Sequence, residues 1–215
     1  MKRLMEQIGE AVRGRIGEAE LSHLENEIRK CILRGFARGG RAPAPEEIAA
    51  ELVLPIDTVS KTIEKLGNAD ILLSKGGHII SAYPFSAVET RHRVIFEDGH
   101  EVYALCATDA LGIHFMLGDN ITILSRCPEC EDEIRIVVKE GRITSATPED
   151  AVEFVGDRER CGCTAETMCP FINFFCSQEH LEAWRLKNLE YRDGEIYSPN
   201  EALEYGRSIF GDFVK

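Results

Sequence analysis

The sequence predicts an α+β protein, in which an N-terminal helical and winged helix-turn-helix-like part precedes a mixed or antiparallel sheet with flanking helices. Three observations support this class. Residues 1–38 carry apolar side chains at helical spacing, residues 45–82 read as two short helices and a hairpin, and strand-like alternation begins near residue 91. We therefore expect three units, at residues 1–40, 41–88 and 89–215.

The first unit is predicted to consist of helices. Its clearest segment is LSHLENEIRKCILRGF, in which apolar side chains recur every three or four residues. The glycines of GFARGGRAPAP then end the pattern. The apolar stripe of this helix is formed by Leu21, Leu24, Ile28, Ile32 and Phe36.

The second unit has the element order of a winged helix-turn-helix. Helices are expected at about 45–52 and 57–66, joined by the turn VLPID and followed by a hairpin around the Gly-Gly pair at 76–77. Such domains usually read DNA, but the second helix offers only Lys61 and Lys65 as cations. Residues 1–100 hold 14 Lys/Arg against 15 Asp/Glu. We therefore interpret this unit as a scaffold.

The third unit begins with HRVIFEDGHEVYALC, a hairpin with an Asp-Gly turn that leads to Cys106. NITILSRC and DEIRIVVKEGRI follow as strands joined by the turn CPEC. ATPEDAVEFVG is interpreted as a strand linker or a short helix, and MCPFINFFCS as a strand or a strand edge. Two helices complete the order: SQEHLEAWRLKN, capped by Ser177, and SPNEALEYGRSIFGDF, capped at Ser198 or Asn200.

The net charge of −12 is concentrated in the second half of the chain. Residues 101–215 hold 11 Lys/Arg against 22 Asp/Glu, a balance that repels a phosphate backbone. Nucleic acid is therefore not an expected partner. No apolar run approaches the ~20 residues of a spanning helix, and the N-terminus lacks the apolar core of a signal peptide. We expect a cytoplasmic protein without a membrane partner.

Seven of the eight cysteines lie between residues 106 and 176. Because disulfides are rare in a reducing compartment, this clustering indicates metal or thiolate chemistry. CPEC has the spacing of a zinc knuckle, and CGC offers two further thiolates for a tetrahedral site. One hypothesis is therefore a structural zinc, and the other is a set of reduced cysteines in turns. The zinc ligands would be Cys127, Cys130, Cys161 and Cys163.

Cys106 and Cys169 differ from these pairs, because each lies in an apolar stretch without a cysteine at knuckle spacing. If CATDALG begins a helix, Cys106 and Asp109 share a face. Desolvation in an apolar pocket raises the pKa of a carboxyl, so that it can carry a proton at neutral pH. Two thiolates and such an acid suit a soft metal whose bond to carbon is broken by proton delivery.

Two motifs resemble the organomercurial lyase (alkylmercury lyase) family: YALCATDALG, followed 21 positions after Cys106 by Cys127, and CPFINFFCSQEHLEAW. The resemblance runs from about residue 42 to residue 184. It implies protonolysis of the carbon–mercury bond of organomercurials, giving a hydrocarbon and Hg(II), without an organic cofactor. It also implies that residues 89–215 are catalytic, with Cys106 and Cys169 binding the mercury, Asp109 carrying the proton and Cys127 structural.

The sequence departs from the family pattern after Cys169, where Pro170 replaces a further cysteine. Cys163 and Cys176 therefore stay open as alternatives for the second thiol. His180 is interpreted as a solvated residue of a first helical turn. The resemblance implies small cytosolic thiols and mercuric reductase as acceptors of Hg(II), in mercury resistance and detoxification. The rival hypothesis is a metal-responsive winged-helix regulator, or a thiol-rich metal-binding protein without lyase activity.

Overall fold

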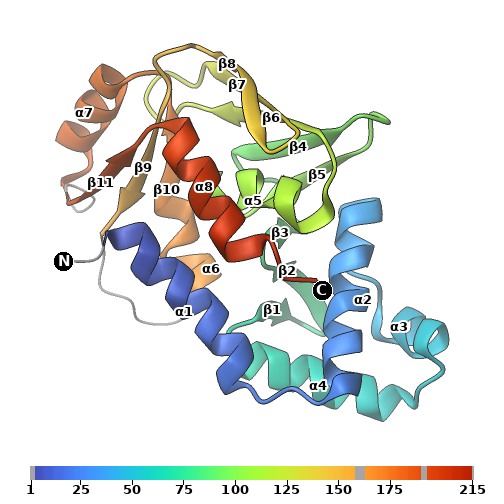
Figure 1. Cartoon of the computed structure of the whole chain (residues 1–215). Coiled ribbons are helices and arrows are strands. Elements are labelled where there is room, and N and C mark those ends of the chain that lie inside the picture. The colour runs from blue at the N-terminus through green and yellow to red at the C-terminus, as the bar shows by residue number, and fades with distance from the viewer. Residues whose placement is uncertain (1–2, 158–162, 190–192, 215) are drawn as a thin grey trace.

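The structure is a computed structural model that describes residues 3–157, 163–189 and 193–214. Two antiparallel sheets run through the described residues (Figure 1). The larger contains β1 (Leu72–Lys75), β2 (His78–Ala82), β3 (Phe85–Ser86), β4 (His92–Phe96), β5 (Glu101–Ala104), β6 (Ile121–Arg126), β7 (Glu133–Lys139) and β8 (Arg142–Thr147), in the order β1-β2-β3-β5-β4-β6-β7-β8. The smaller contains β9 (Val152–Gly156), β10 (Ile172–Phe175) and β11 (Gly194–Tyr197), with β9 in the centre.

The described residues also form helices, so the mixed helical and antiparallel character expected from the sequence is confirmed. In chain order they are α1 (Leu4–Glu18), α2 (His23–Gly39), α3 (Pro45–Leu52), α4 (Ile56–Asn68), α5 (Ala107–Leu117), α6 (Thr164–Thr167), the 3-10 turn η1 (Cys169–Phe171), α7 (Gln178–Lys187) and α8 (Pro199–Phe210). Within the described ranges, no helix combines the length and apolar character needed to cross a membrane.

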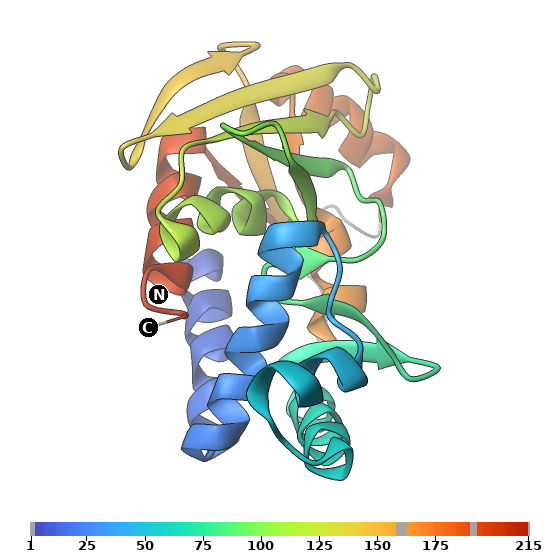
Figure 2. The ribbon, with the colours of Figure 1, turned by 90° about the vertical axis from the view of Figure 1, so that its right-hand side faces the viewer.

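The expected helices at 45–52 and 57–66 and the hairpin after them are confirmed as α3, α4 and β1–β2. They lie beside α2 at one end of the molecule (Figure 2). The hairpin is not isolated from the rest, because β2 pairs with β3 and β3 pairs with β5. The larger sheet therefore continues from the hairpin into the strand that leads to Cys106.

Sequence reasoning was wrong about the segment ATPEDAVEFVG, in which residues 152–156 form strand β9. Residues 153–156 are buried, since β10 and β11 flank the strand on both sides. A short, mostly apolar run is compatible with a helix or a buried strand, and the preceding polar TPED resembles a helix start. The expected strand in MCPFINFFCS is confirmed as β10, whereas β3, β11 and α6 were not anticipated.

Helix α5 occupies the centre of the fold. It lies between the larger sheet and α8, and α1 packs along α8 (Figures 1 and 2). The crossing of α5 and α8 is close because two glycines meet there: a Cβ on Gly206 would lie 3.0 Å from the Gly112 nitrogen, and a Cβ on Gly112 would lie 2.1 Å from Phe210. Nine of the eleven residues of α5 are buried. Groups at the start of α5 are therefore held in a dry, rigid environment.

Candidate active site

The expected helix after Cys106 is confirmed as α5, and Cys106 itself is the N-cap. Its extended backbone continues from β5, and its sulfur accepts a hydrogen bond from the Asp109 backbone N–H at 3.4 Å. A helix start leaves several N–H groups without intrahelical partners, and the cap sulfur satisfies one of them. The strand–helix junction thus fixes the position of the thiol and of the carboxyl three residues later.

The structure brings Cys106, Asp109 and Cys169 together. The Cys106 sulfur donates to Asp109 Oδ2 at 3.1 Å, and the Cys169 sulfur lies 3.9 Å from the same oxygen. The three candidate ligand atoms all lie within 4.8 Å of one another. Each residue is at most 5% exposed. We call these three residues the Cys2Asp cluster.

The electrostatics of the Cys2Asp cluster favour its protonated form. Desolvation raises the pKa of Asp109 from 3.8 to about 7, against the opposing effect of hydrogen bonds from both thiols. Burial likewise raises the pKa of Cys106 well above its ordinary value. The contact with Cys106 lowers the pKa of Cys169, but burial and the Asp109 charge outweigh it, and the net direction is upward. Near neutral pH, both sulfurs therefore carry protons and the carboxyl is poised to exchange one.

The side chains of Glu153 and Tyr83 are also buried near this cluster, and the sequence did not predict a role for either. Glu153 in β9 accepts a hydrogen bond from the Thr108 hydroxyl at 2.6 Å, and burial raises its pKa to about 8. Its second oxygen and the Tyr83 hydroxyl have no hydrogen-bond partner among the described residues. Among the acids that the structure describes, Glu153 and Asp109 are the buried ones, but the strand that carries Glu153 has no motif that predicts this.

Cys169 also lines a cavity of about 370 Å³. Its walls mix apolar side chains, among them Ile80, Val88 and Leu105, with polar groups such as His92 and Asn173. This cavity therefore borders one residue of the Cys2Asp cluster.

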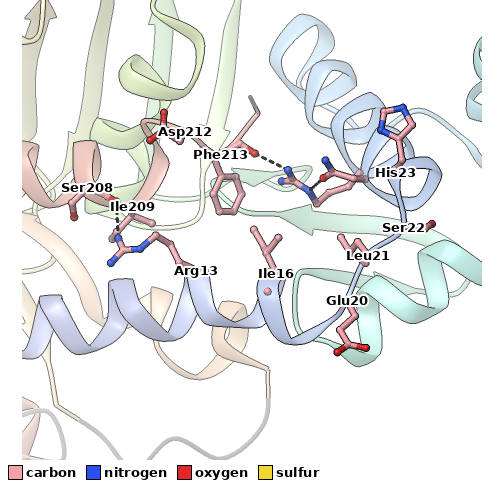
Figure 3. A pocket seen from close by; sticks show the side chains of 13 residues that line it. Arg13, Ile16, Glu20, Leu21, Ser22, His23, Ser208, Ile209, Asp212 and Phe213 are labelled. Carbon is pink, nitrogen blue, oxygen red and sulfur yellow. Dashed lines mark hydrogen bonds between the residues drawn. The ribbon is translucent and has the colours of Figure 1, made fainter.

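A larger cavity, of about 540 Å³, lies elsewhere, between α1, the start of α2 and the C-terminal segment (Figure 3). In it, Arg13 donates to the Ser208 carbonyl and Arg29 donates to the Phe213 carbonyl. None of the described cysteines lines this cavity. It therefore does not border either cysteine of the Cys2Asp cluster.

Of the four cysteines in the zinc hypothesis, the structure describes three, and Cys163 does not lie with Cys127 and Cys130. Cys127 and Cys130 lie with two residues at the start of α7, and we call the four the Cys3His cluster: Cys127, Cys130, Cys176 and His180. The ligand atoms of this cluster all lie within 4.8 Å of one another. Cys161 lies outside the described residues. Cys163 belongs to neither cluster and occupies the N-cap position of α6, where Asp70 accepts a hydrogen bond from the Thr164 backbone N–H.

These placements bear on the second thiol and on His180. Among the cysteines in the described ranges, Cys169 is the one that joins Cys106 around Asp109, whereas Cys163 and Cys176 lie in other environments. His180 is half-buried, with Nδ1 3.8 Å from the Cys127 sulfur, and sequence reasoning set it aside as solvated. The Cys-x3-His spacing of CSQEH was the signal that could have identified it.

Comparisons with known proteins identify the family and the fold. Residues 85–211 match the family described as MerB: Alkylmercury lyase. The alkylmercury lyase of Staphylococcus epidermidis (strain ATCC 12228 / FDA PCI 1200) is 28% identical over 179 residues, which cover 83% of this chain and 79% of the relative. The alkylmercury lyase of Bacillus cereus is 26% identical over 169 residues, covering 79% and 74%. The crystal structure of the mercury-bound form of MerB2 has the same fold, with a TM-score of 0.79, 22% identity and coverage of 96% and 98%.

Proposed function

The chain belongs to the alkylmercury lyase family, and on this premise we propose that it cleaves the carbon–mercury bond of organomercurials by protonolysis, releasing a hydrocarbon and Hg(II). One observation supports the proposal above all others. A buried carboxyl oxygen of Asp109 lies 3.1 Å from the Cys106 sulfur and 3.9 Å from the Cys169 sulfur. A soft metal and a proton can therefore meet at one point.

The first step is capture of the organomercury cation from a small thiol. The Cys106 sulfur forms a bond to mercury, and the proton of Cys106 leaves with the departing thiolate as a free thiol. The N–H of Asp109 that points at Cys106 stabilises negative charge on this sulfur as the proton departs. The cavity at Cys169 supplies a route by which the substrate reaches the cluster.

The second step adds the other sulfur and moves its proton. Asp109 accepts the proton of Cys169 while that sulfur bonds to mercury. A carboxyl with a pKa of about 7 is a far better base toward a thiol than an ordinary aspartate, and it is still acidic enough to give the proton up. Electron density from two sulfurs makes the mercury-bound carbon basic.

The third step breaks the bond to carbon. Asp109 passes its proton to the carbon, the electron pair of the carbon–mercury bond becomes the new carbon–hydrogen bond, and the hydrocarbon leaves. Mercury keeps its +2 state, bound to Cys106 and Cys169, and Asp109 returns to its starting charge. Of the two thiol protons, one has gone to the departing thiol and the other to the hydrocarbon. Small thiols or mercuric reductase then accept the Hg(II), in a cytoplasmic detoxification role.

We also propose that residues 41–88 form a winged helix-turn-helix-like scaffold. Lys65, one of the two cations of α4, is bound in an ion pair with Glu25 at 2.9 Å. That contact ties α4 to the start of α2 and leaves little positive charge for a phosphate backbone. This observation favours the lyase over the rival DNA-binding regulator.

The test is hydrocarbon release from phenylmercury or methylmercury in excess thiol. We expect Cys106→Ser, Asp109→Asn and Cys169→Ser each to abolish turnover while circular dichroism stays unchanged. Cys31→Ser is the matched control, because Cys31 is equally buried but lies in α2 outside both clusters, and it should keep wild-type turnover. Full activity in any of the first three variants would remove that residue from the mechanism.

A further inference from the structure

We propose that the Cys3His cluster binds one structural zinc ion. The cluster combines two close pairs. One pair is contributed by the CPEC turn between β6 and β7, and the other by the junction of β10 and α7. The ligand atoms are the sulfurs of Cys127, Cys130 and Cys176 and a ring nitrogen of His180.

The distances fit a tetrahedral zinc site. With Zn–S near 2.3 Å and Zn–N near 2.0 Å, two sulfurs of a tetrahedron lie about 3.8 Å apart, and a sulfur and a nitrogen about 3.5 Å apart. The Cys130 and Cys176 sulfurs are separated by 3.7 Å, and the Cys127 sulfur lies 3.8 Å from His180 Nδ1. The sulfur pair is much too far apart for a disulfide, whose bond is about 2.0 Å long. The four atoms thus already occupy positions that one ion could bridge.

The donor set selects the metal. Three thiolates and one imidazole are typical of structural zinc, whereas hard cations such as Mg²⁺ and Ca²⁺ prefer oxygen ligands. Backbone N–H groups of Cys176, Cys130 and Glu129 are directed at the Cys127 sulfur, as in the turns that hold metal-bound thiolates. No carboxylate belongs to the cluster. The Cys3His cluster therefore differs in donor type from the Cys2Asp cluster, which has an acid in place of a third sulfur.

Zinc at this point would join the two sheets. The β6–β7 turn belongs to the larger sheet, while Cys176 directly follows β10 of the smaller sheet. Helix α7 is already anchored on the smaller sheet, because the Trp184 ring packs 5.5 Å from Phe175. Since η1 and Cys169 directly precede β10, fixing this strand also fixes one side of the Cys2Asp cluster. The zinc would therefore support the active-site geometry without taking part in the chemistry.

The test measures the metal content of protein that has not been exposed to mercury. Full-length protein produced with added zinc and purified without chelator is expected to hold about one zinc per chain. Cys130→Ser, Cys176→Ser and His180→Ala should each lose most of it. Cys163→Ser and Cys31→Ser are the matched controls, one a half-buried and one a buried cysteine outside the cluster, and both should keep it. Removing the zinc should lower the melting temperature by roughly 10 °C, the shift expected for a ligand at about a thousand times its Kd.

Cobalt substitution keeps the test decisive if a variant fails to fold. Titration of the zinc-free wild-type protein with Co(II) should give the intense visible bands of a tetrahedral site and a thiolate charge-transfer band, saturating at one equivalent. His180→Cys should bind cobalt with a shifted spectrum, because a fourth sulfur replaces nitrogen. A wild-type protein that holds no zinc and shows no tetrahedral cobalt spectrum would overturn the proposal. So would zinc content that survives Cys130→Ser and Cys176→Ser, or a site that takes up only mercury.

Discussion

Replacing Asp109 with Asn should stabilise the protein more at pH 8 than at pH 5. Burial raises the pKa of Asp109 from 3.8 to about 7, so between these pH values the folded chain binds more protons than the unfolded chain. Wild-type stability must therefore fall as the pH rises through this window, with the full cost present above pH 7. About three pKa units at about 1.36 kcal/mol each amount to about 4 kcal/mol. The Asn variant lacks this cost.

The assay is urea unfolding of both proteins at pH 5 and pH 8, followed by the fluorescence of Trp184, the single tryptophan. The difference in unfolding free energy, variant minus wild type, should grow by about 2.5 kcal/mol between the two pH values, since part of the cost is already present at pH 5. The hydrogen bonds that the variant loses change its unfolding free energy by the same amount at both pH values. Their contribution therefore cancels when the two pH values are compared. Asp119→Asn, at an exposed acid beyond the other end of α5, is the control in which an acid is replaced by its amide outside the buried cluster. A difference for Asp109→Asn that does not change with pH would refute the claim that this carboxyl stores a proton near neutrality.

Three other substitutions test the packing around the site. Gly112→Ala should destabilise the fold by about 3 kcal/mol in urea unfolding, because its Cβ would lie 2.1 Å from a Phe210 ring carbon; a neutral effect would mean that α5 and α8 can separate freely. Ser177→Ala should cost about 1 kcal/mol, measured in the same way, because the Ser177 hydroxyl caps α7 by accepting from the His180 N–H. Tyr83→Phe should leave the melting temperature equal or higher, because the buried hydroxyl has no hydrogen-bond partner among the described residues; a lower melting temperature would reveal one.

Local signals predicted most of the elements. Helix α5, the helices at 45–52 and 57–66, and the hairpin between β1 and β2 follow from caps, glycine turns and apolar spacing, which act over a few residues. The exceptions are β3, β11 and α6, each two to four residues long, and β9, whose mostly apolar run fits either a strand or a helix. The pairing of β3 with both β2 and β5 is a long-range contact that spacing does not reveal. The unit boundaries at residues 40 and 88 remain predictions.

The candidate site was predictable to the extent that it is local. Cys106 and Asp109 are three residues apart at a helix start, so a helical pattern was enough to place them together. Cys169 lies 60 residues beyond Asp109, and only the resemblance of a whole motif connected it to them. The grouping of CPEC with CGC stays a prediction for Cys161, which lies outside the described residues, but Cys163 does not lie with Cys127 and Cys130. The described neighbours of CPEC come from the end of β10, which pairs with β9, and from α7, and spacing in the sequence does not reveal this long-range contact.

The proposed chemistry needs a protonated carboxyl at Asp109 and stabilised negative charge on the Cys106 sulfur, and both groups lie at the start of α5. A helix N-terminus normally lowers the pKa of a carboxyl in its first turn, yet burial of Asp109 is strong enough to reverse this, and the carboxyl can carry a proton near pH 7. The same N-terminus directs an N–H at Cys106, where negative charge develops when the thiol gives up its proton to bind a metal. Desolvation therefore raises the pKa of both groups, whereas the backbone N–H at the helix end opposes this effect at the sulfur. An exposed helix start with the same residues would keep the thiolate stabilisation but lose the proton, so the close packing of α8 on α5 through Gly112 and Gly206 is a requirement of the proposed chemistry as well as of the fold.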